Sequence, residues 1–195
     1  MGAKAEKTKE KIRAAAYELF AAKGFKQVTM SDLCEQTGLS RGGLYRYYSG
    51  TGEIFSEILT EEYAVEDRIR TGERARVILD DMLRVIMQEI SDREHSLSLA
   101  IYEYASLGNE ALFTRITGRA KARWEALIRY GMETDGFQKV NPAQAADLIL
   151  YYYQGLRMWS RVIPLGEAEA EFYVKTVRQM LLGGAPDYGA YENTI

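Results

Sequence analysis

Arginine and tyrosine side chains are concentrated in one short segment near the N-terminus, at Arg41, Tyr45, Arg46 and Tyr47. A guanidinium group can bind a phosphate or the O6 and N7 atoms of guanine in the major groove, and a tyrosine hydroxyl can bind a phosphate. Two arginines could also be ordinary surface charges, but their place among tyrosines favours DNA. We predict that this segment reads DNA, with Arg41 as the contact to guanine.

The residues around this segment predict two short helices joined by a tight turn, within residues 29–48. Thr29 can cap the first helix, with Asp32 as the acid of a capping box, and Gly38 can end it in a left-handed conformation. Ser40 can cap the second helix. Apolar residues at suitable spacings can close a small core, namely Leu33, Cys34, Leu39, Leu44 and Tyr48. The pattern is typical of a helix-turn-helix whose second helix enters the major groove.

The charge of the chain is unevenly distributed. The formal net charge of the 195 residues is −3, which by itself does not favour nucleic acid. Residues 1–50, however, hold nine Lys or Arg against five Asp or Glu, a net charge of +4, and the remainder carries −7. Because an electrostatic footprint is local, this division predicts that only the N-terminal part contacts DNA.

The rest of the chain predicts further helices and no strands, because apolar residues recur at helical spacing and strand-like alternation is nowhere sustained. Asn141 as cap and Pro142 in the first helical position mark one start strongly. The expected fold is all-α with about nine helices, near residues 9–23, 29–38, 40–48, 52–70, 77–90, 97–104, 109–133, 141–163 and 167–182.

Composition limits the possible functions. A hydrophobic content of 47% can fill a real core, and a single cysteine, Cys34, excludes an internal disulfide and is expected to be a core residue. With His95 as the only histidine, no metal site or other cofactor is expected. No apolar run of about 18 residues and no signal peptide are visible, so we expect a cytoplasmic protein without a membrane partner.

The ordered N-terminal pattern resembles the TetR family of bacterial transcriptional regulators over roughly residues 8–60. The residues that carry the resemblance are Ala15, Ala16, Leu19, Phe20, Gly24, Phe25, Thr29, Gly38, Ser40, Gly43, Leu44, Tyr45 and Tyr48. The resemblance implies a homodimer of all-helical subunits, each with a DNA-binding head and a larger body that binds an effector. We expect a head over 1–52, an effector-binding and dimerisation body over 53–184, and a flexible tail over 185–195.

The resemblance also implies roles for individual residues at the DNA. It makes Thr29 and Ser40 helix caps that meet phosphates, and Tyr45 and Tyr47 phosphate contacts. It makes Arg41, Gly42 and Arg46 candidates for base edges. Gly43 stands where the family favours a small residue beside the DNA backbone.

The chain departs from the family pattern after this segment. Where the family usually has Ser-Lys-Glu, this chain has Gly50-Thr51-Gly52, so Thr51 replaces a phosphate-binding lysine. The loss of one cation should flatten the salt dependence, and affinity would then depend more on the N-terminal lysines. Gly42 and Gly43 each cost a helix about 1 kcal/mol relative to alanine, which close approach to DNA or a loosely formed helix could explain.

Aromatic and polar residues of the body are candidates for an effector pocket, although each could equally pack the core. The candidates are Tyr102, Glu103, Phe113, Trp124, Tyr152, Arg157 and Trp159. They would suit an aromatic or hydrophobic small molecule, with Glu103 or Arg157 orienting a polar group. The run Tyr151-Tyr152-Tyr153 should place one ring outside, one inside and one between. The last two helices are expected to form the homodimer interface.

These observations predict a ligand-responsive transcriptional repressor that binds a palindromic operator as a homodimer. One alternative is a small-molecule-binding protein of the same fold without specific operator recognition, suggested by Thr51 and the double glycine. A second alternative is a helical enzyme that uses Glu103, His95 or the tyrosines as acid and base. No phosphate loop, metal cluster or nucleophile motif supports catalysis, so we predict no catalytic residues and no enzyme.

Overall fold

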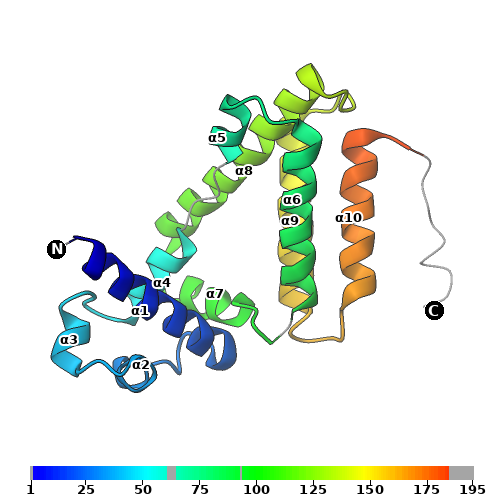
Figure 1. Cartoon of the computed structure of the whole chain (residues 1–195). Helices are drawn as coiled ribbons and strands as arrows, with labels where there is room; N and C mark the ends of the chain where they lie inside the picture. The colour runs from blue at the N-terminus through cyan, green and yellow to red at the C-terminus, as the bar shows by residue number, and fades with distance from the viewer. Residues whose placement is uncertain (1, 61–64, 93, 185–195) are drawn as a thin grey trace. The chain divides into compact units, whose positions relative to one another are not determined.

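A computed structural model describes residues 2–60, 65–92 and 94–184, and every regular element in this part of the chain is a helix (Figure 1). The all-α prediction is confirmed, with ten helices rather than about nine. The helices are α1 (Gly2–Lys23), α2 (Met30–Thr37), α3 (Arg41–Tyr45), α4 (Thr51–Leu59), α5 (Val65–Arg70), α6 (Ala75–Ser91), α7 (Ser98–Ala105), α8 (Glu110–Thr134), α9 (Pro142–Trp159) and α10 (Glu167–Leu182). The expected tail over 185–195 lies outside the described residues.

The prediction of a single helix over 52–70 is wrong, because two helices lie there, and this accounts for the extra helix. α4 ends at Leu59, and α5 begins at Val65. The Thr60 hydroxyl donates to the carbonyls of Ser56 and Glu57, at 2.9 and 3.1 Å. These bonds occupy carbonyl groups in the last turn of α4, which ends at Leu59 directly before Thr60.

The chain forms two compact units, and the first consists of residues 1–62 together with residues 94–116. Its core joins α1, the helix pair and α4 to α7. The buried apolar residues of this core are Ile12, Ala16, Phe20, Ala21, Val28, Met30, Leu33, Leu44, Tyr48, Ile54, Phe55, Leu97, Ala100 and Tyr104. The compact unit therefore extends beyond the expected head over 1–52, because α7 supplies part of its core.

Tyr104 of α7 is the residue that ties this late segment to the first unit. Its ring lies 4.5 Å from that of Phe25 and 5.1 Å from that of Phe55, measured between centroids. Its hydroxyl donates to the carbonyl of Gly52 at 3.2 Å and shares a hydrogen bond with the Ser56 hydroxyl at 2.9 Å. α7 thus holds the beginning of α4 through both packing and hydrogen bonds.

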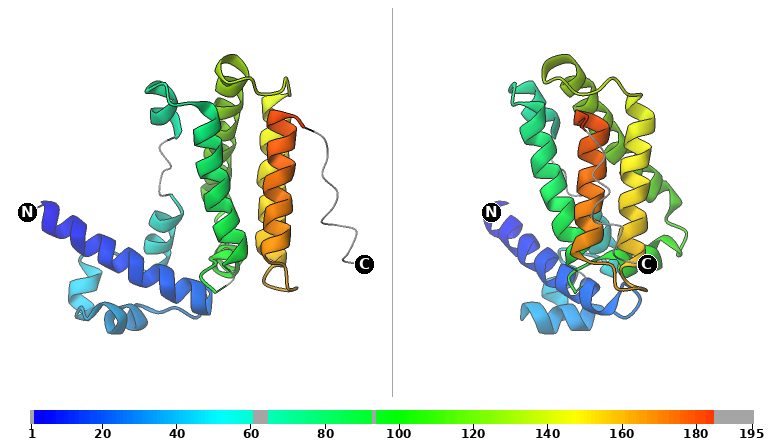
Figure 2. Two further views of the ribbon diagram at one scale, coloured as in Figure 1. Left: turned by 45° about the vertical axis from the view of Figure 1, so that its right-hand side comes forward. Right: turned by 90° about the vertical axis from the view of Figure 1, so that its right-hand side faces the viewer.

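The second unit consists of residues 63–93 and 117–195, and within it α6, α9 and α10 lie side by side (Figure 2). The inward stripe of α6 contains Ile78, Leu79, Leu83, Ile86 and Ile90, all buried. α9 begins as predicted, with the Asn141 side chain accepting hydrogen bonds from the amides of Ala143 and Gln144. No helix in the described part of the chain is long and apolar enough to cross a membrane.

Candidate DNA-binding interface

The helix pair is capped as the sequence predicts. Thr29 accepts a hydrogen bond from the Asp32 amide, and the Asp32 carboxylate accepts one from the Thr29 amide, which completes a capping box. The Thr29 hydroxyl and the nearby Lys23 hold the pKa of Asp32 well below its usual range. Gly38 ends α2 with a φ of 69°, in the left-handed region. Ser40 caps α3 by accepting from the Gly43 amide at 3.2 Å.

The core beneath the pair also forms as predicted. Leu33, Leu44 and Tyr48 are buried, and Cys34 and Leu39 are half-buried against them. The ammonium group of Lys9 lies 5.1 Å from the centre of the Tyr48 ring, and burial raises the pKa of the Tyr48 hydroxyl to about 12. This packing fixes α3 on the first unit and leaves its other face outward.

α3 is shorter than predicted, because it spans five residues and ends at Tyr45. Arg46 and Tyr47 lie in the turn that follows, and Tyr48 lies beyond that turn rather than on the helix. Gly42 and Gly43 occupy two of the five helical positions, so the helix has little intrinsic stability. A Cβ atom at Gly42 would meet open space, and one at Gly43 would lie 3.1 Å from the Ser40 hydroxyl.

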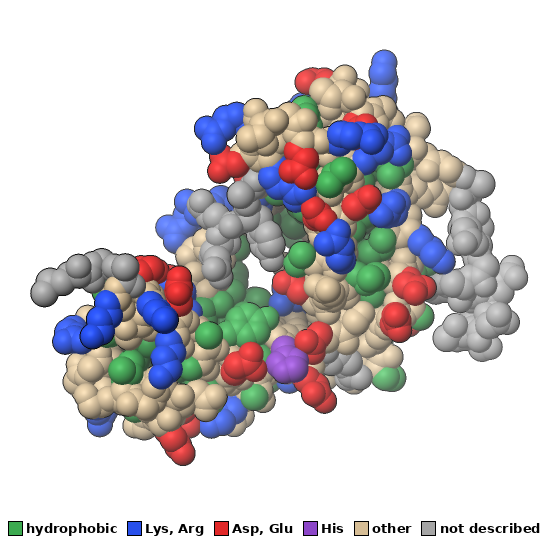
Figure 3. Space-filling model, viewed as in Figure 1, with side chains coloured by type: hydrophobic (Ala, Val, Ile, Leu, Met, Phe, Trp, Pro, Cys, Tyr) green, Lys and Arg blue, Asp and Glu red, His purple; other side chains and the backbone are tan. Residues whose placement is uncertain are grey.

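The outward face carries the predicted DNA-binding side chains. Arg41, Tyr45 and Arg46 are exposed, and Tyr47 is half-buried. The Arg41 guanidinium lies 5.8 Å from the centre of the Tyr45 ring, and that of Arg46 lies 5.4 Å from the Tyr47 ring. Figure 3 shows several Lys and Arg side chains at the surface of the N-terminal unit, as well as others on the second unit. Cations over tyrosine faces therefore present both charge and hydroxyl groups to solvent.

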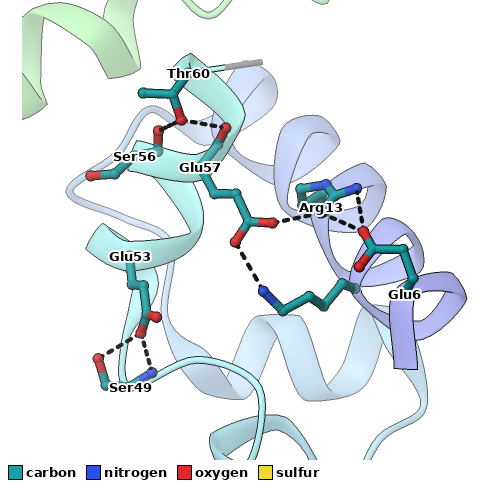
Figure 4. A network of polar contacts seen from close by, with 8 residues as sticks. Glu6, Arg13, Ser49, Glu53, Ser56, Glu57 and Thr60 are labelled. Carbon is teal, nitrogen blue, oxygen red and sulfur yellow. Dashed lines mark hydrogen bonds and ion pairs between the residues drawn. The ribbon is translucent and has the colours of Figure 1, made fainter. Parts of the chain in front are cut away.

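The three predicted DNA contacts with a small hydroxyl side chain differ in their exposure and hydrogen bonding. They are Thr29, Ser40 and Thr51. The hydroxyls of Thr29 and Ser40 are exposed but already serve as helix caps. Thr51 is the first residue of α4 and is half-buried, and Gly50 before it offers no side-chain cap. The Ser49 amide and hydroxyl instead donate to Glu53, at 2.7 and 2.8 Å (Figure 4).

A polar network fixes α1 against α4 (Figure 4). Arg13 donates to the Glu57 carboxylate at 2.6 Å, and Lys9 forms an ion pair with the same carboxylate at 3.4 Å. Glu6 lies 3.4 Å from Arg13. Because α4 follows the helix pair directly, this network fixes α1 within the same unit.

The candidate effector residues are divided between the two units. Tyr102, Glu103 and Phe113 belong to the first, where Tyr102 is exposed and Glu103 accepts a hydrogen bond from the Lys26 amide at 2.9 Å. Phe113 packs half-buried against the first core, with its ring 6.3 Å from that of Tyr104.

Of the candidates in the second unit, Trp124 is 3% exposed and belongs to the core. Tyr152 and Trp159 line an open apolar groove along α9 and the segment after it, together with Tyr151, Gly155, Leu156, Ile163 and Leu165. The tyrosine run lies as expected, with Tyr151 exposed, Tyr152 half-buried and Tyr153 buried.

Arg157 belongs to a polar cluster that the sequence analysis missed. It donates to the Tyr153 hydroxyl at 2.8 Å, and Tyr153 donates to the Glu89 carboxylate of α6. Burial raises the pKa of Glu89, although Arg157 opposes that shift from 3.9 Å. The Nε atom of Arg157 is buried without a hydrogen-bond partner in the described structure. Glu89 occupies a place at helical spacing from Met82 and Ile86, and this interruption of an apolar stripe was the available signal.

Comparisons with known proteins agree with this geometry. Residues 12–58 match the model of the family described as bacterial regulatory proteins, tetR family. The chain is 27% identical over 193 residues to YfiR of Bacillus subtilis strain 168, an uncharacterized HTH-type transcriptional regulator, covering 89% of this chain and 93% of that protein.

Solved structures share the fold at low sequence identity. The reduced form of NemR from Escherichia coli matches with a TM-score of 0.73 and 16% identity, over 92% of this chain and all of that one (100%). NalD from Pseudomonas aeruginosa, the secondary repressor of the MexAB-OprM multidrug efflux pump, matches with a TM-score of 0.61 and 19% identity, over 91% and 98%.

The capped pair, its buried core and its exposed basic and aromatic face define a helix-turn-helix DNA-binding protein. The N-terminal unit therefore carries the DNA-binding domain of the TetR family of bacterial transcriptional regulators, which residues 12–58 match. Proteins of this family are regulators rather than enzymes.

Proposed function

We propose that this chain is a repressor that binds a palindromic operator as a homodimer and is released by a small-molecule effector. The observation that carries the proposal is a capped and well-packed helix pair that presents exposed Arg41 and Tyr45 on α3, with exposed Arg46 and half-buried Tyr47 in the turn after it. A regulator that binds operator DNA acts where that DNA lies, so we propose that the protein acts in the cytoplasm.

Arg41 is the proposed contact to a base edge. It lies at the exposed first position of α3, and a guanidinium group can bind the O6 and N7 atoms of guanine with about 1 to 3 kcal/mol of discrimination. Tyr45 and Tyr47 would bind phosphates on either side, and Arg46 a base edge or a phosphate. The open space at Gly42 supports close approach of this helix to DNA.

The exposed face of α9 supports a homodimer. Leu148, Tyr151, Met158 and Trp159 are 65%, 66%, 39% and 56% exposed, and with Gly155 they recur at the three- and four-residue spacing of a helix–helix seam. Val162 and Ile163 extend this apolar surface beyond the helix. A second copy of the chain would cover it through a two-fold contact, which in turn requires a two-fold symmetric operator.

The effector proposed for the second unit is an aromatic or hydrophobic molecule with one polar group. Tyr152 and Trp159 offer aromatic surface in the groove, and Trp159 is shared with the proposed dimer surface. Arg157 is not among the residues that line the groove, but it follows Leu156 on α9 and has a buried nitrogen without a partner among the described residues. Quenching of tryptophan fluorescence by candidate aromatic compounds would identify ligands. If no compound that binds the protein changes its affinity for the operator, the proposal that an effector releases the protein from DNA is wrong.

Selection of binding sites from a random duplex library at fixed salt tests the DNA-binding function. We expect a palindrome, which Arg41→Ala binds about 10- to 100-fold more weakly and with relaxed preference at one base pair of each half-site. Arg70→Ala, which removes an exposed arginine of the second unit, is the matched control and should select the wild-type palindrome.

The same selection addresses a second candidate function, a ligand-binding protein of this fold without operator recognition. The half-buried Thr51 and the five-residue α3 with two glycines favour this candidate. Its signature would be salt-sensitive binding without a recovered motif, equal in wild type and Arg41→Ala.

A further inference from the structure

α1 begins at Gly2, about two turns before the predicted start at Lys9. The added turns carry two lysines, Lys4 and Lys7. Lys4, Lys7, Thr8 and Lys11 are spaced i, i+3, i+4 and i+7, so they share one face of the helix. We call these four residues the N-terminal face of α1.

The contacts of the N-terminal face show that it borders the helix-turn-helix. The ammonium group of Lys11 donates to the carbonyl of Thr37, the last residue of α2, at 2.8 Å. The Thr8 hydroxyl interacts with the hydroxyl of Tyr47, and the charge of Lys4 also acts on that phenol. Together with Arg46, these groups lower the pKa of Tyr47. Two successive turns of α1 thus lie beside the segment proposed to bind phosphates.

The opposite side of α1 is already engaged. Lys9 and Arg13 bind the Glu57 carboxylate, and their cations are therefore largely neutralised within the protein. Lys4 and Lys7, in contrast, are exposed and form no ion pair with a described residue. The first two turns consequently present uncompensated positive charge beside Tyr47.

We propose that Lys4 and Lys7 bind phosphates of the operator next to the phosphate contacted by Tyr47, so that α1 extends the DNA-binding surface beyond the helix-turn-helix. This inference rests on the proposed DNA-binding function. Ammonium groups on flexible stems bind phosphates as point charges and read no bases. The two lysines would supply affinity and salt dependence, and Arg41 the sequence preference.

The test is the salt dependence of operator binding by the full-length double variant Lys4→Gln/Lys7→Gln. Each phosphate contact contributes about 0.9 to the slope of log K against log salt. Two lysines in each of two subunits should therefore reduce the magnitude of that slope by up to about four. The palindrome selected from a random library should stay the same. Glutamine and lysine have similar helix propensity, so circular dichroism should show an unchanged melting temperature.

The matched control is Lys26→Gln/Lys139→Gln, which removes the same charge from exposed lysines outside the N-terminal face. A slope equal to that of the control would overturn the inference while leaving the proposed function intact, provided that both proteins recover the palindrome. A changed palindrome would also overturn it, because phosphate contacts carry no base preference. Absence of DNA binding by the wild type would instead overturn both proposals.

Discussion

Glu89 of α6 is a half-buried acidic residue of the second unit. Its carboxylate accepts a hydrogen bond from the buried Tyr153 and lies 3.9 Å from the Arg157 guanidinium. Burial outweighs the guanidinium and raises the pKa of Glu89 above its usual value. The residue therefore combines a structural hydrogen bond with a charge that is incompletely compensated.

The raised pKa of Glu89 predicts a pH-dependent contribution to stability. An acid whose pKa is higher in the folded chain binds protons more strongly when folded, so folding stability falls as the pH rises from its ordinary pKa through the raised one. Glu89→Gln keeps an acceptor for Tyr153 and removes this titration. We expect the variant to lose less stability than the wild type between mildly acidic and neutral pH.

Urea unfolding of both proteins across this pH range measures the effect. Glu133→Gln, on an exposed position of α8, is the control and should follow the wild type. Parallel stability profiles for Glu89→Gln and the wild type would mean that Glu89 titrates normally.

At the scale of elements, α3 is a helix whose sequence weakens it. Gly42 and Gly43 each forgo about 1 kcal/mol relative to alanine, and the Ser40 cap restores about 1 kcal/mol. The buried Leu44 anchors the helix to the core. α3 is therefore held mainly by its cap and its anchor.

Gly42→Ala should stabilise the free protein. The added Cβ meets open space, so we expect the free energy of unfolding of the first unit to rise by about 0.5 to 1 kcal/mol. Gly43→Ala should gain less, because its Cβ would lie 3.1 Å from the Ser40 hydroxyl. Chemical unfolding followed by circular dichroism distinguishes the two variants. Equal or greater stabilisation by Gly43→Ala would contradict this account of the cap.

Sequence patterns predicted the elements whose causes are local. Thr29, Asp32, Gly38 and Ser40 act through neighbouring backbone groups, and their caps form as expected. The separation of α4 from α5 was missed, because the apolar residues Ile54, Phe55, Ile58, Leu59 and Val65 keep helical spacing across it. The contact of Tyr104 with Gly52 and that of Glu89 with Tyr153 join residues far apart in the chain, so spacing alone could not reveal them.

At the scale of the whole molecule, the proposed dimer can be tested through the apolar surface of α9. Leu148→Glu places a charge on the proposed contact surface in place of a 65% exposed apolar side chain, so we expect sedimentation velocity to show monomers at concentrations where the wild type is dimeric. Affinity for a palindrome should fall, because each monomer would bind one half-site alone.

Val77→Glu provides the control for this experiment, since Val77 is an exposed apolar residue of α6 outside the proposed surface. It should remain dimeric. A dimeric Leu148→Glu variant would place the subunit contact elsewhere.

The late contribution of α7 to the first core has a consequence for synthesis. The ribosome produces the helix-turn-helix first, but Leu97, Ala100 and Tyr104 complete its core only after all of α6 has been made. Until then, the aromatic rings of Phe25 and Phe55 lack their Tyr104 neighbour. A nascent chain of this length exposes apolar surface that a chaperone can bind, and the DNA-binding unit finishes folding only when α7 emerges.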